Sequence, residues 1–430
     1  MTRPIHAGLM LACALTLAAC TVGDAGPSPT HAPAVPEDDA LAGYALTLTV
    51  VDEGLAEEAE ALDASIYVAA PLLTKGTQAV IELRGDLAPL TAVDVTGASL
   101  AALGATDDAL VGLSRACVSD NGGYAFCARP TRLGADGAAI DEDAEALDLD
   151  HHAIAPDPDG EGFWALRYVP TPCDGDVHPC DFPTEDEPLD RVLDCEVVHV
   201  RDGKAVWEWS ALEHVADSTL DAAATTPIYE PADPFHCNSV QPDDAGEVAY
   251  VSMRHPSTVM AIDVGSGEIL WTLGIDATEA ALEVEDPEGL LDGRPVLSGQ
   301  HDFRWLGGDR FSVFDNGSGG AGPARFIVFS VAGGTATVET VVEDPDGRES
   351  RCTGSARPLD ADERFWAVSW GCSETGVSVM TDDGREVARL AIDLDAALEA
   401  DLLVDVATEQ PDLGHTVSYQ AVVARPGLLD

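Results

Sequence analysis

The sequence repeats one pattern of paired β-strands, and this repeat limits the possible folds more than any other feature. The copy that starts at His301 has a short strand, a turn at Gly307-Gly308 and a returning strand that ends at Phe314-Asp315. Glycine pairs adopt the positive φ angles that tight hairpin turns require. The same order of strand, turn and strand starts again near three other positions, His151, Phe235 and Gly354.

Each of these hairpins is followed by a second hairpin. The second turns lie at Asp202-Gly203, Gly265-Ser266-Gly267, Gly333-Gly334 and Asp382-Asp383-Gly384. Two consecutive hairpins make a four-stranded blade, and repeated blades predict a β-propeller. An irregular sandwich is the alternative, but the matching turn positions argue against it.

The N-terminal region has a different pattern. Alternating apolar segments separated by acidic and Gly-rich turns occupy residues 44–130, which is typical of a small antiparallel sandwich. We therefore expect an all-β chain, with a β-sandwich domain over 44–130 and the propeller over 131–430. The acidic stretch at 53–63 is either a short helix or an exposed loop.

The repeat predicts a cluster of polar side chains. The first strand of each propeller blade lines the central channel, and His152, His236 and His301 all lie at the start of such a strand. We expect these histidines to converge at one mouth of the channel. Ser355 has the equivalent position in the fourth copy. A lone histidine is usually structural, but three at equivalent positions favour a functional site.

Two further groups join this cluster. Arg254, with His255 beside it, faces His236 across its own hairpin. Asn238 follows His236 by two residues and shares its strand face. Neutral imidazole is a competent nucleophile, and a guanidinium can donate hydrogen bonds to two oxygens of a tetrahedral anion at once. Three histidines could bind zinc instead, but Arg254 would repel the ion. No Gly-x-Ser-x-Gly motif supports a serine hydrolase.

The N-terminus indicates export. Arg3, a short apolar run and Leu17-Ala18-Ala19-Cys20 resemble a lipoprotein signal peptide over 1–20 whose lipobox leaves Cys20 lipidated. An ordinary cleaved signal peptide is the alternative. Residues 21–43 then form a flexible linker. We expect a lipoprotein at the periplasmic face of the outer membrane or the cell surface, in contact with the membrane through its lipid anchor only.

Charge and cysteines agree with that location. The formal net charge of −55 repels phosphate backbones, which excludes nucleic acid as a partner. Beyond Cys13 and Cys20, the cysteines are expected to form disulfides in an oxidising compartment. No Cys-x-x-Cys motif indicates zinc, and we expect no metal. The expected disulfide pairs are Cys117–Cys127, Cys173–Cys180 and Cys352–Cys372, which leaves Cys195 and Cys237 as a further pair.

Three stretches carry a resemblance to a known family. They are 233–240 (DPFHCNSV), 251–274 (VSMRHPSTV through GEILWTLG) and 300–317 (QHD with FDNG). In order and spacing they resemble the PAPS-independent bacterial arylsulfotransferases, and the resemblance covers about residues 145–425. It implies a six-bladed propeller with an N-terminal β-domain, exported to the periplasm.

The resemblance also implies a reaction. This family moves a sulfuryl group from a phenolic sulfate ester to a phenol, in a ping-pong reaction through a sulfohistidine and with no cofactor. His301 would be the nucleophile, and Arg254, His236 and Asn238 would hold the sulfuryl oxygens. His152 or His151 would assist at the phenolic oxygen, with His255 near the substrate. Cys237 departs from the family pattern, which more often has an aliphatic residue there.

Two other functions fit the same sequence. A non-catalytic surface propeller would keep this scaffold and bind a ligand or a protein. A quinoprotein-like dehydrogenase would account for Gly267-Glu268-Ile269-Leu270-Trp271, but only one repeat of that type is well formed. The sequence does not predict the oligomeric state.

Overall fold

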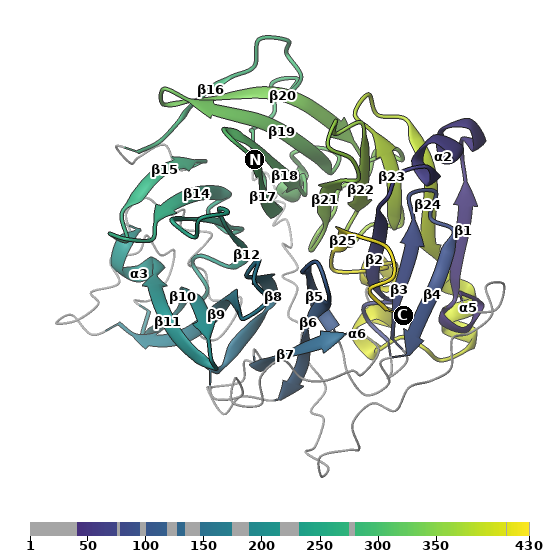
Figure 1. The fold of residues 1–430 in the computed structure, drawn as a ribbon, viewed down its shortest axis with the longest axis horizontal. Coiled ribbons are helices and arrows are strands. Elements are labelled where there is room, and N and C mark those ends of the chain that lie inside the picture. The colour runs from purple at the N-terminus through teal and green to yellow at the C-terminus, as the bar shows by residue number, and fades with distance from the viewer. Residues whose placement is uncertain are drawn as a thin grey trace, which may run out of the picture.

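The computed structural model describes nine segments of the chain. They are residues 41–74, 78–94, 100–117, 127–133, 147–173, 189–215, 232–274, 280–409 and 411–429. Among them, five β-sheets are arranged in a ring around a common centre (Figure 1). The fold is therefore all-β and propeller-like, as the repeat predicts. Cys20 and the segments 1–20 and 21–40 lie outside the described residues.

Two consecutive sheets are built from the hairpins that the sequence indicates. The first contains β12 (Cys237–Pro242), β13 (Val248–Met253), β14 (Thr258–Asp263) and β15 (Ile269–Leu273). The second contains β17 (His301–Gly307), β18 (Arg310–Asp315), β19 (Arg325–Ala332), β20 (Thr335–Glu343) and the short β16 (Glu283–Glu285). The turn between β17 and β18 has φ angles of 105° and 60° at Gly307 and Gly308, as a Gly-Gly hairpin requires.

The two ends of the chain complete two other sheets. β1 (Leu46–Val50) pairs with β24, in the sheet of β21 (Ser355–Pro358), β22 (Phe365–Ser369), β23 (Val377–Thr381) and β24 (Glu386–Ile392). β25 (Ala421–Ala424) pairs with β2, in the sheet of β2 (Ser65–Ala70), β3 (Ala79–Arg84) and β4 (Pro89–Asp94). Each end of the chain thus joins strands that lie far away in the sequence, which ties the ring together.

The fifth sheet has seven strands in two parts. They are β5 (Leu100–Ala105), β6 (Leu110–Cys117) and β7 (Cys127–Leu133), then β8 (Leu149–Pro156), β9 (Gly162–Pro172), β10 (Arg191–Arg201) and β11 (Lys204–Ser210). Only the pair Ala128–Leu149 joins β7 to β8. Side chains of the two parts, Leu113 and Phe163 among them, share one hydrophobic cluster.

These pairings correct the predicted domain organisation. The separate β-sandwich over 44–130 is not observed, because its strands belong to three sheets of the ring. The boundary at 130/131 falls inside β7. The strand pairing also does not form six separate blades. Four sheets have the four or five strands of a blade, and the fifth sheet has seven. The N-terminal strands supply sheets that the sequence repeat does not show.

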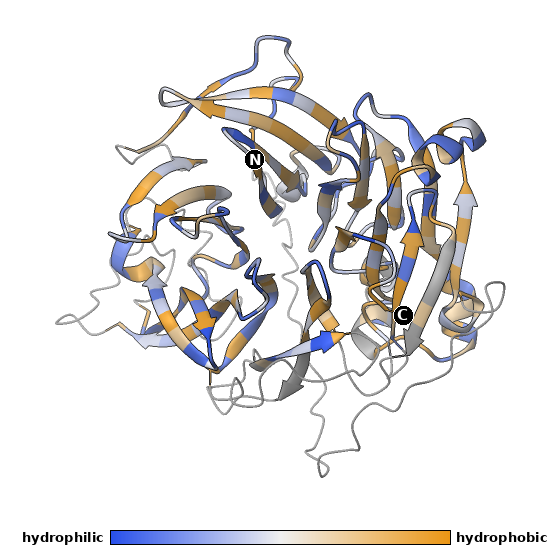
Figure 2. Ribbon diagram, in the orientation of Figure 1, coloured by the Kyte–Doolittle hydropathy of each residue, from blue (hydrophilic) through white to orange (hydrophobic). Residues whose placement is uncertain are grey.

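Apolar side chains fill the spaces between neighbouring sheets. Phe303, Phe311 and Phe329 pack between the β12–β15 and β17–β20 sheets, and Trp366 and Trp370 pack between the β17–β20 and β21–β24 sheets. Burying such large rings contributes about 1.5–3 kcal/mol each. Figure 2 shows the apolar positions along the strands and hydrophilic stretches on the inner strands. Packing between the sheets therefore holds the inner strands around one axis.

The helices are short and lie at the edges. They are α2 (Glu53–Glu60), α3 (Ala211–His214), α5 (Leu394–Glu399), α6 (Asp405–Glu409) and α7 (Pro411–Gly414). The 3₁₀ helices η1 (Ala42–Tyr44) and η4 (Ser318–Gly320) are shorter still. The acidic stretch at 53–63 is thus a helix, and the side chain of Asp52 caps it by accepting from the amides of Gly54 and Leu55. None of the helices in the described segments is long and apolar enough to span a bilayer.

Candidate active site

Three histidines from three inner strands come together. The ring centroids of His152 on β8 and His236 before β12 are 5.1 Å apart. Tyr419 links His152 to His301, with centroid separations of 5.8 and 6.2 Å. The convergence that the repeat predicts for His152, His236 and His301 is therefore observed. All three are largely buried. The side chains of His152 and His236 are 8% and 12% exposed, and His301 as a whole residue is 2% exposed.

Each histidine lies at an irregularity of its strand. The pairing register shifts between Leu149 and Ile154 on β8, and between His301 and Arg304 on β17. A third shift, between Cys237 and Ser239, follows His236. Bulges re-aim side chains next to active sites. Here they turn the first residues of the inner strands toward the centre of the ring.

His301 has one fixed tautomer. Its Nδ1 lies 2.7 Å from Oδ1 of Asn316. The Nδ2 group of Asn316 donates to Ser350 and to the carbonyl of Thr353, so Oδ1 is the acceptor that faces the imidazole. The proton of neutral His301 is therefore on Nδ1, and Nε2 keeps its lone pair.

His236 and His152 are oriented by carboxylates. Asp233 accepts the amide of His236 at 2.8 Å and its Nδ1 at 2.6 Å, and these contacts hold His236 at a φ of 51°, which is uncommon outside glycine. Asp150 accepts the Nδ1 of His152 at 2.5 Å.

Arg254 lies at the same mouth. Its amide donates to the carbonyl of His236 at 3.0 Å, which is the pairing across the hairpin that the sequence predicts. One Nη group donates to the carbonyl of Arg351 at 3.0 Å. Its charge acts on the histidines: burial, His152 and Arg254 lower the pKa of His236 well below its usual value. Burial and Arg254 do the same to the pKa of His301, so both rings are neutral at pH 7.

The remaining predicted residues have supporting positions. His255 packs on His236 at 4.6 Å and its Nδ1 donates to the carbonyl of Asp233, while burial lowers its pKa to about 3. His151 stacks on His152 with the ring centroids 4.4 Å apart, and it is His152 whose ring contacts His236. Asn238 donates to the carbonyl of Gln300 and so ties β12 to the strand that carries His301. Ser355 bonds to Ala421 instead of joining the cluster.

Sequence reasoning missed four groups that complete the site. Asn316 and Asp233 lie in the stretches that resemble the family, but the sequence does not place them or Asp150 at the site. Tyr168 contacts the rings of His152 and His236 and donates to the carbonyl of Cys237. One signal exists for the acids: an aspartate precedes His152 by two residues and His236 by three.

Two groups of side chains bring possible metal-ligand atoms together. They are Asp150 with His151 and His152, and Asp233 with His236 and His255. In each group a histidine Nδ1 already lies at hydrogen-bond distance from the carboxylate, at 2.5 and 2.6 Å. This arrangement orients imidazoles, and the arginine charge nearby disfavours a cation.

Two disulfides are formed within the described segments. Cys195–Cys237 joins β10 to β12, and Cys352–Cys372 joins the segment before β21 to the one after β22. Cys173 is also disulfide-bonded, but its expected partner Cys180 lies outside the described residues. Cys117 and Cys127 are paired in the β6–β7 register, and their side chains are not described. Cys237 therefore forms a crosslink beside His236.

The fold and the site together define a class: an all-β, propeller-like protein with a histidine–arginine cluster at the centre of the ring. The family model described as Arylsulfotransferase (ASST) matches residues 129–369, more than half of the chain. The protein belongs to the arylsulfotransferase family. No curated protein matches the sequence.

Solved structures match over most of the chain at low identity. A protein of unknown function from Bacteroides caccae is 10% identical, covers 84% of this chain and 99% of its own, and has a TM-score of 0.43. The periplasmic gluconolactonase of Pseudomonas aeruginosa is 14% identical over 82% of this chain and 81% of its own, with a TM-score of 0.40. TolB from Acinetobacter baumannii is 10% identical over 83% of this chain and 66% of its own, with a TM-score of 0.43.

Proposed function

We propose that this protein transfers a sulfuryl group from a phenolic sulfate ester to a phenolic acceptor, through a sulfohistidine at His301. The observation that carries this proposal is the hydrogen bond from His301 Nδ1 to Asn316 Oδ1. It leaves a buried, neutral imidazole with its Nε2 lone pair beside a guanidinium. A nucleophile and an anion-binding cation are the two groups that such a transfer needs.

In the first half-reaction the Nε2 lone pair of His301 attacks the sulfur of the donor. The bond between sulfur and the phenolic oxygen breaks, and its electron pair leaves with that oxygen. Arg254 binds the sulfuryl oxygens, because their charge needs a fixed donor in a water-poor site. His236 is neutral and its Nδ1 donates to Asp233, so it packs beside these oxygens and does not donate to them. As in phosphoryl transfer, the protein contributes mainly in-line positioning and charge stabilisation.

The departing phenolate takes a proton from His152. Asp150, which is fully buried, accepts a hydrogen bond from His152 Nδ1 and so orients this ring for the proton transfer. In the second half-reaction His152 accepts the proton of the incoming phenol, whose oxygen attacks sulfur and releases His301 Nε2. The contact of His152 with His236 supports this role for His152 over His151.

The test is a phenol-dependent assay. Purified protein is incubated with 4-nitrophenyl sulfate, with and without phenol, and nitrophenol release is measured. We expect phenol-dependent release that disappears in His301→Ala. Mass spectrometry after donor alone should find a sulfuryl group on His301. If no donor and acceptor pair turns over, the proposal fails and a binding propeller becomes the better function.

We also propose that the protein is an exported lipoprotein. The motif at Leu17-Ala18-Ala19-Cys20 supports this location, as do the disulfides, which persist in oxidising compartments. Labelling cells with a radioactive fatty acid should mark the protein, and Cys20→Ala should remove the label. A chain that is exported but never labelled would contradict the lipid anchor.

A further inference from the structure

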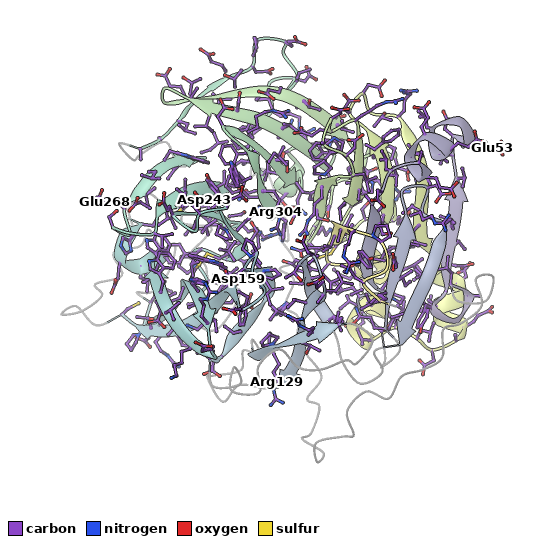
Figure 3. All side chains as sticks on the ribbon, in the orientation of Figure 1. Glu53, Arg129, Asp159, Asp243, Glu268 and Arg304 are labelled. Carbon is purple, nitrogen blue, oxygen red and sulfur yellow. A yellow bond between two sulfur atoms is a disulfide. The ribbon has the colours of Figure 1, made fainter. Side chains whose placement is uncertain are left out.

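A second polar cavity lies further along the inner strands than the histidine cluster. It has a volume of about 210 Å³, and its lining includes Ile154, Gln241, Asp243, Asp244, Arg304 and Arg357. Arg304 follows His301 by three residues on β17, so it lies roughly 10 Å further along the strand. Figure 3 shows Arg304 beside the centre of the ring. This cavity is thus separate from the candidate active site.

Two arginines in the cavity share one buried carboxylate. Asp302, which is fully buried, accepts from Arg304 Nε at 2.8 Å and from Arg357 Nη2 at 2.9 Å. Burial opposes ionisation of Asp302, but the two arginines keep its pKa below the usual value. One carboxylate therefore pairs with two guanidiniums. Burial and repulsion by Arg357 lower the pKa of Arg304 to about 10, because Asp302 compensates these two effects only in part.

Both arginines keep unused donors. Within the described segments, Arg304 uses only Nε, and Arg357 uses Nε and Nη2, and both bond to Asp302. The two Nη groups of Arg304 and Nη1 of Arg357 have no protein partner there. The arginine side chains are only 12% and 13% exposed, so these donors are little screened by bulk water.

We propose that this cavity binds a sulfate-sized oxyanion between Arg304 and Arg357. Paired guanidiniums bind the oxygens of such anions in a fork geometry, and the volume admits a small ligand. Asp243 and Asp244 line the same cavity and oppose every anion, so the binding comes from the two guanidiniums and a large polyanion fits less well than a small one. This binding does not depend on the sulfuryl transfer proposed above.

The test is calorimetric titration with sodium sulfate, with ionic strength held constant by sodium chloride. The parent protein carries Arg254→Gln, so that sulfate at the histidine cluster does not contribute. We expect one sulfate to bind per chain. Arg357→Gln should weaken that binding at least tenfold, and sulfate should no longer raise the melting temperature of this variant.

Two milder variants avoid disturbing Asp302. Gln241→Glu places a negative charge at the cavity and keeps an oxygen to accept the amide of Trp305, now at 3.1 Å. It should weaken sulfate binding at least fivefold, whereas Asp244→Asn should tighten it severalfold. Glu57→Gln, on the exposed side of α2, is the matched control and should change nothing.

Two results would overturn the proposal. One is the absence of sulfate binding to the Arg254→Gln protein. The other is binding that neither Arg357→Gln nor Gln241→Glu alters. Because the titration uses no sulfate ester, an inactive enzyme would not affect either result.

Discussion

The Nδ1 of His301 lies 2.7 Å from Oδ1 of Asn316, on the turn that follows β18. Asn316 is itself held by Ser350 and Thr353 and is fully buried, so its amide cannot rotate freely. One side chain thus fixes both the orientation and the tautomer of the proposed nucleophile. Asn316 acts through His301, as a positioning residue.

Asn316→Asp should move the pH optimum of the reaction. A carboxylate facing Nδ1 favours imidazolium and raises the pKa of His301, so less neutral nucleophile exists at pH 7. We expect kcat/KM to fall at pH 7 and to recover as the pH rises. The pH profile of kcat/KM, measured beside the wild-type profile, checks this. An unchanged profile would remove Asn316 from the mechanism.

Arg254→Lys should lower kcat/KM by about 10²–10³-fold, the effect of removing one donor to a developing oxyanion. A lysine keeps the positive charge but lacks the planar fork of donors that binds two oxygens at once. Arg351→Lys is the control, because it keeps the backbone carbonyl that accepts from Arg254. Steady-state assays of both variants test the prediction, and near-normal turnover by Arg254→Lys would disprove the role.

His152→Gln and His151→Gln should differ strongly. His152 contacts His236 and is hydrogen-bonded to Asp150. Its loss should therefore lower kcat about 10²–10⁴-fold with a donor whose phenolate is a poor leaving group. The loss of His151 should lower the rate much less, because that ring stacks on His152 while His152 makes the contact with His236. Comparing both variants across donors of different phenol acidity separates a proton donor from a packing residue. Equal losses would mean that the assignment to His152 is wrong.

Stability should fall as the pH drops below about 6.5. The folded pKa values of His236, His255 and His301 are depressed, so below pH 6.5 the unfolded chain binds more protons and unfolding is favoured. Above that pH the three histidines are neutral in both the folded and the unfolded chain, so they no longer make the free energy of unfolding depend on pH. Each histidine contributes about 1.4 kcal/mol per pH unit. Urea unfolding between pH 7.5 and 5.5 should show a smaller slope for His301→Ala than for wild type, and identical slopes would contradict the depressed pKa.

The Cys195–Cys237 disulfide should support activity as well as stability. It anchors the residue between His236 and Asn238 to β10. Cys195→Ala/Cys237→Ala should lose about 2–4 kcal/mol of unfolding free energy and most of the activity. Ile327→Ala, which removes buried side-chain atoms from β19 outside the histidine cluster and should cost a similar free energy of unfolding, is the matched control. If both variants lose activity in proportion to stability, the disulfide has no special role at the site.

The sequence alone determined the blade hairpins and the cluster at their ends. Strand alternation and turns such as Gly307-Gly308 are local properties, so they predict β12–β15 and β17–β20 directly. Register across a hairpin is local too, which is why Arg254 was placed opposite His236. Because repeat positions are equivalent, three histidines far apart in sequence were expected at one mouth.

Only the tertiary structure decided the rest. Pairing of β1 with β24 and of β25 with β2 joins segments more than 300 residues apart, and no local pattern marks such partners. The N-terminal strands therefore looked like a separate sandwich. The bulges that aim His152, His236 and His301, and the contact of Asn316 with His301, depend on how neighbouring sheets pack, and packing between sheets is not encoded in any single stretch.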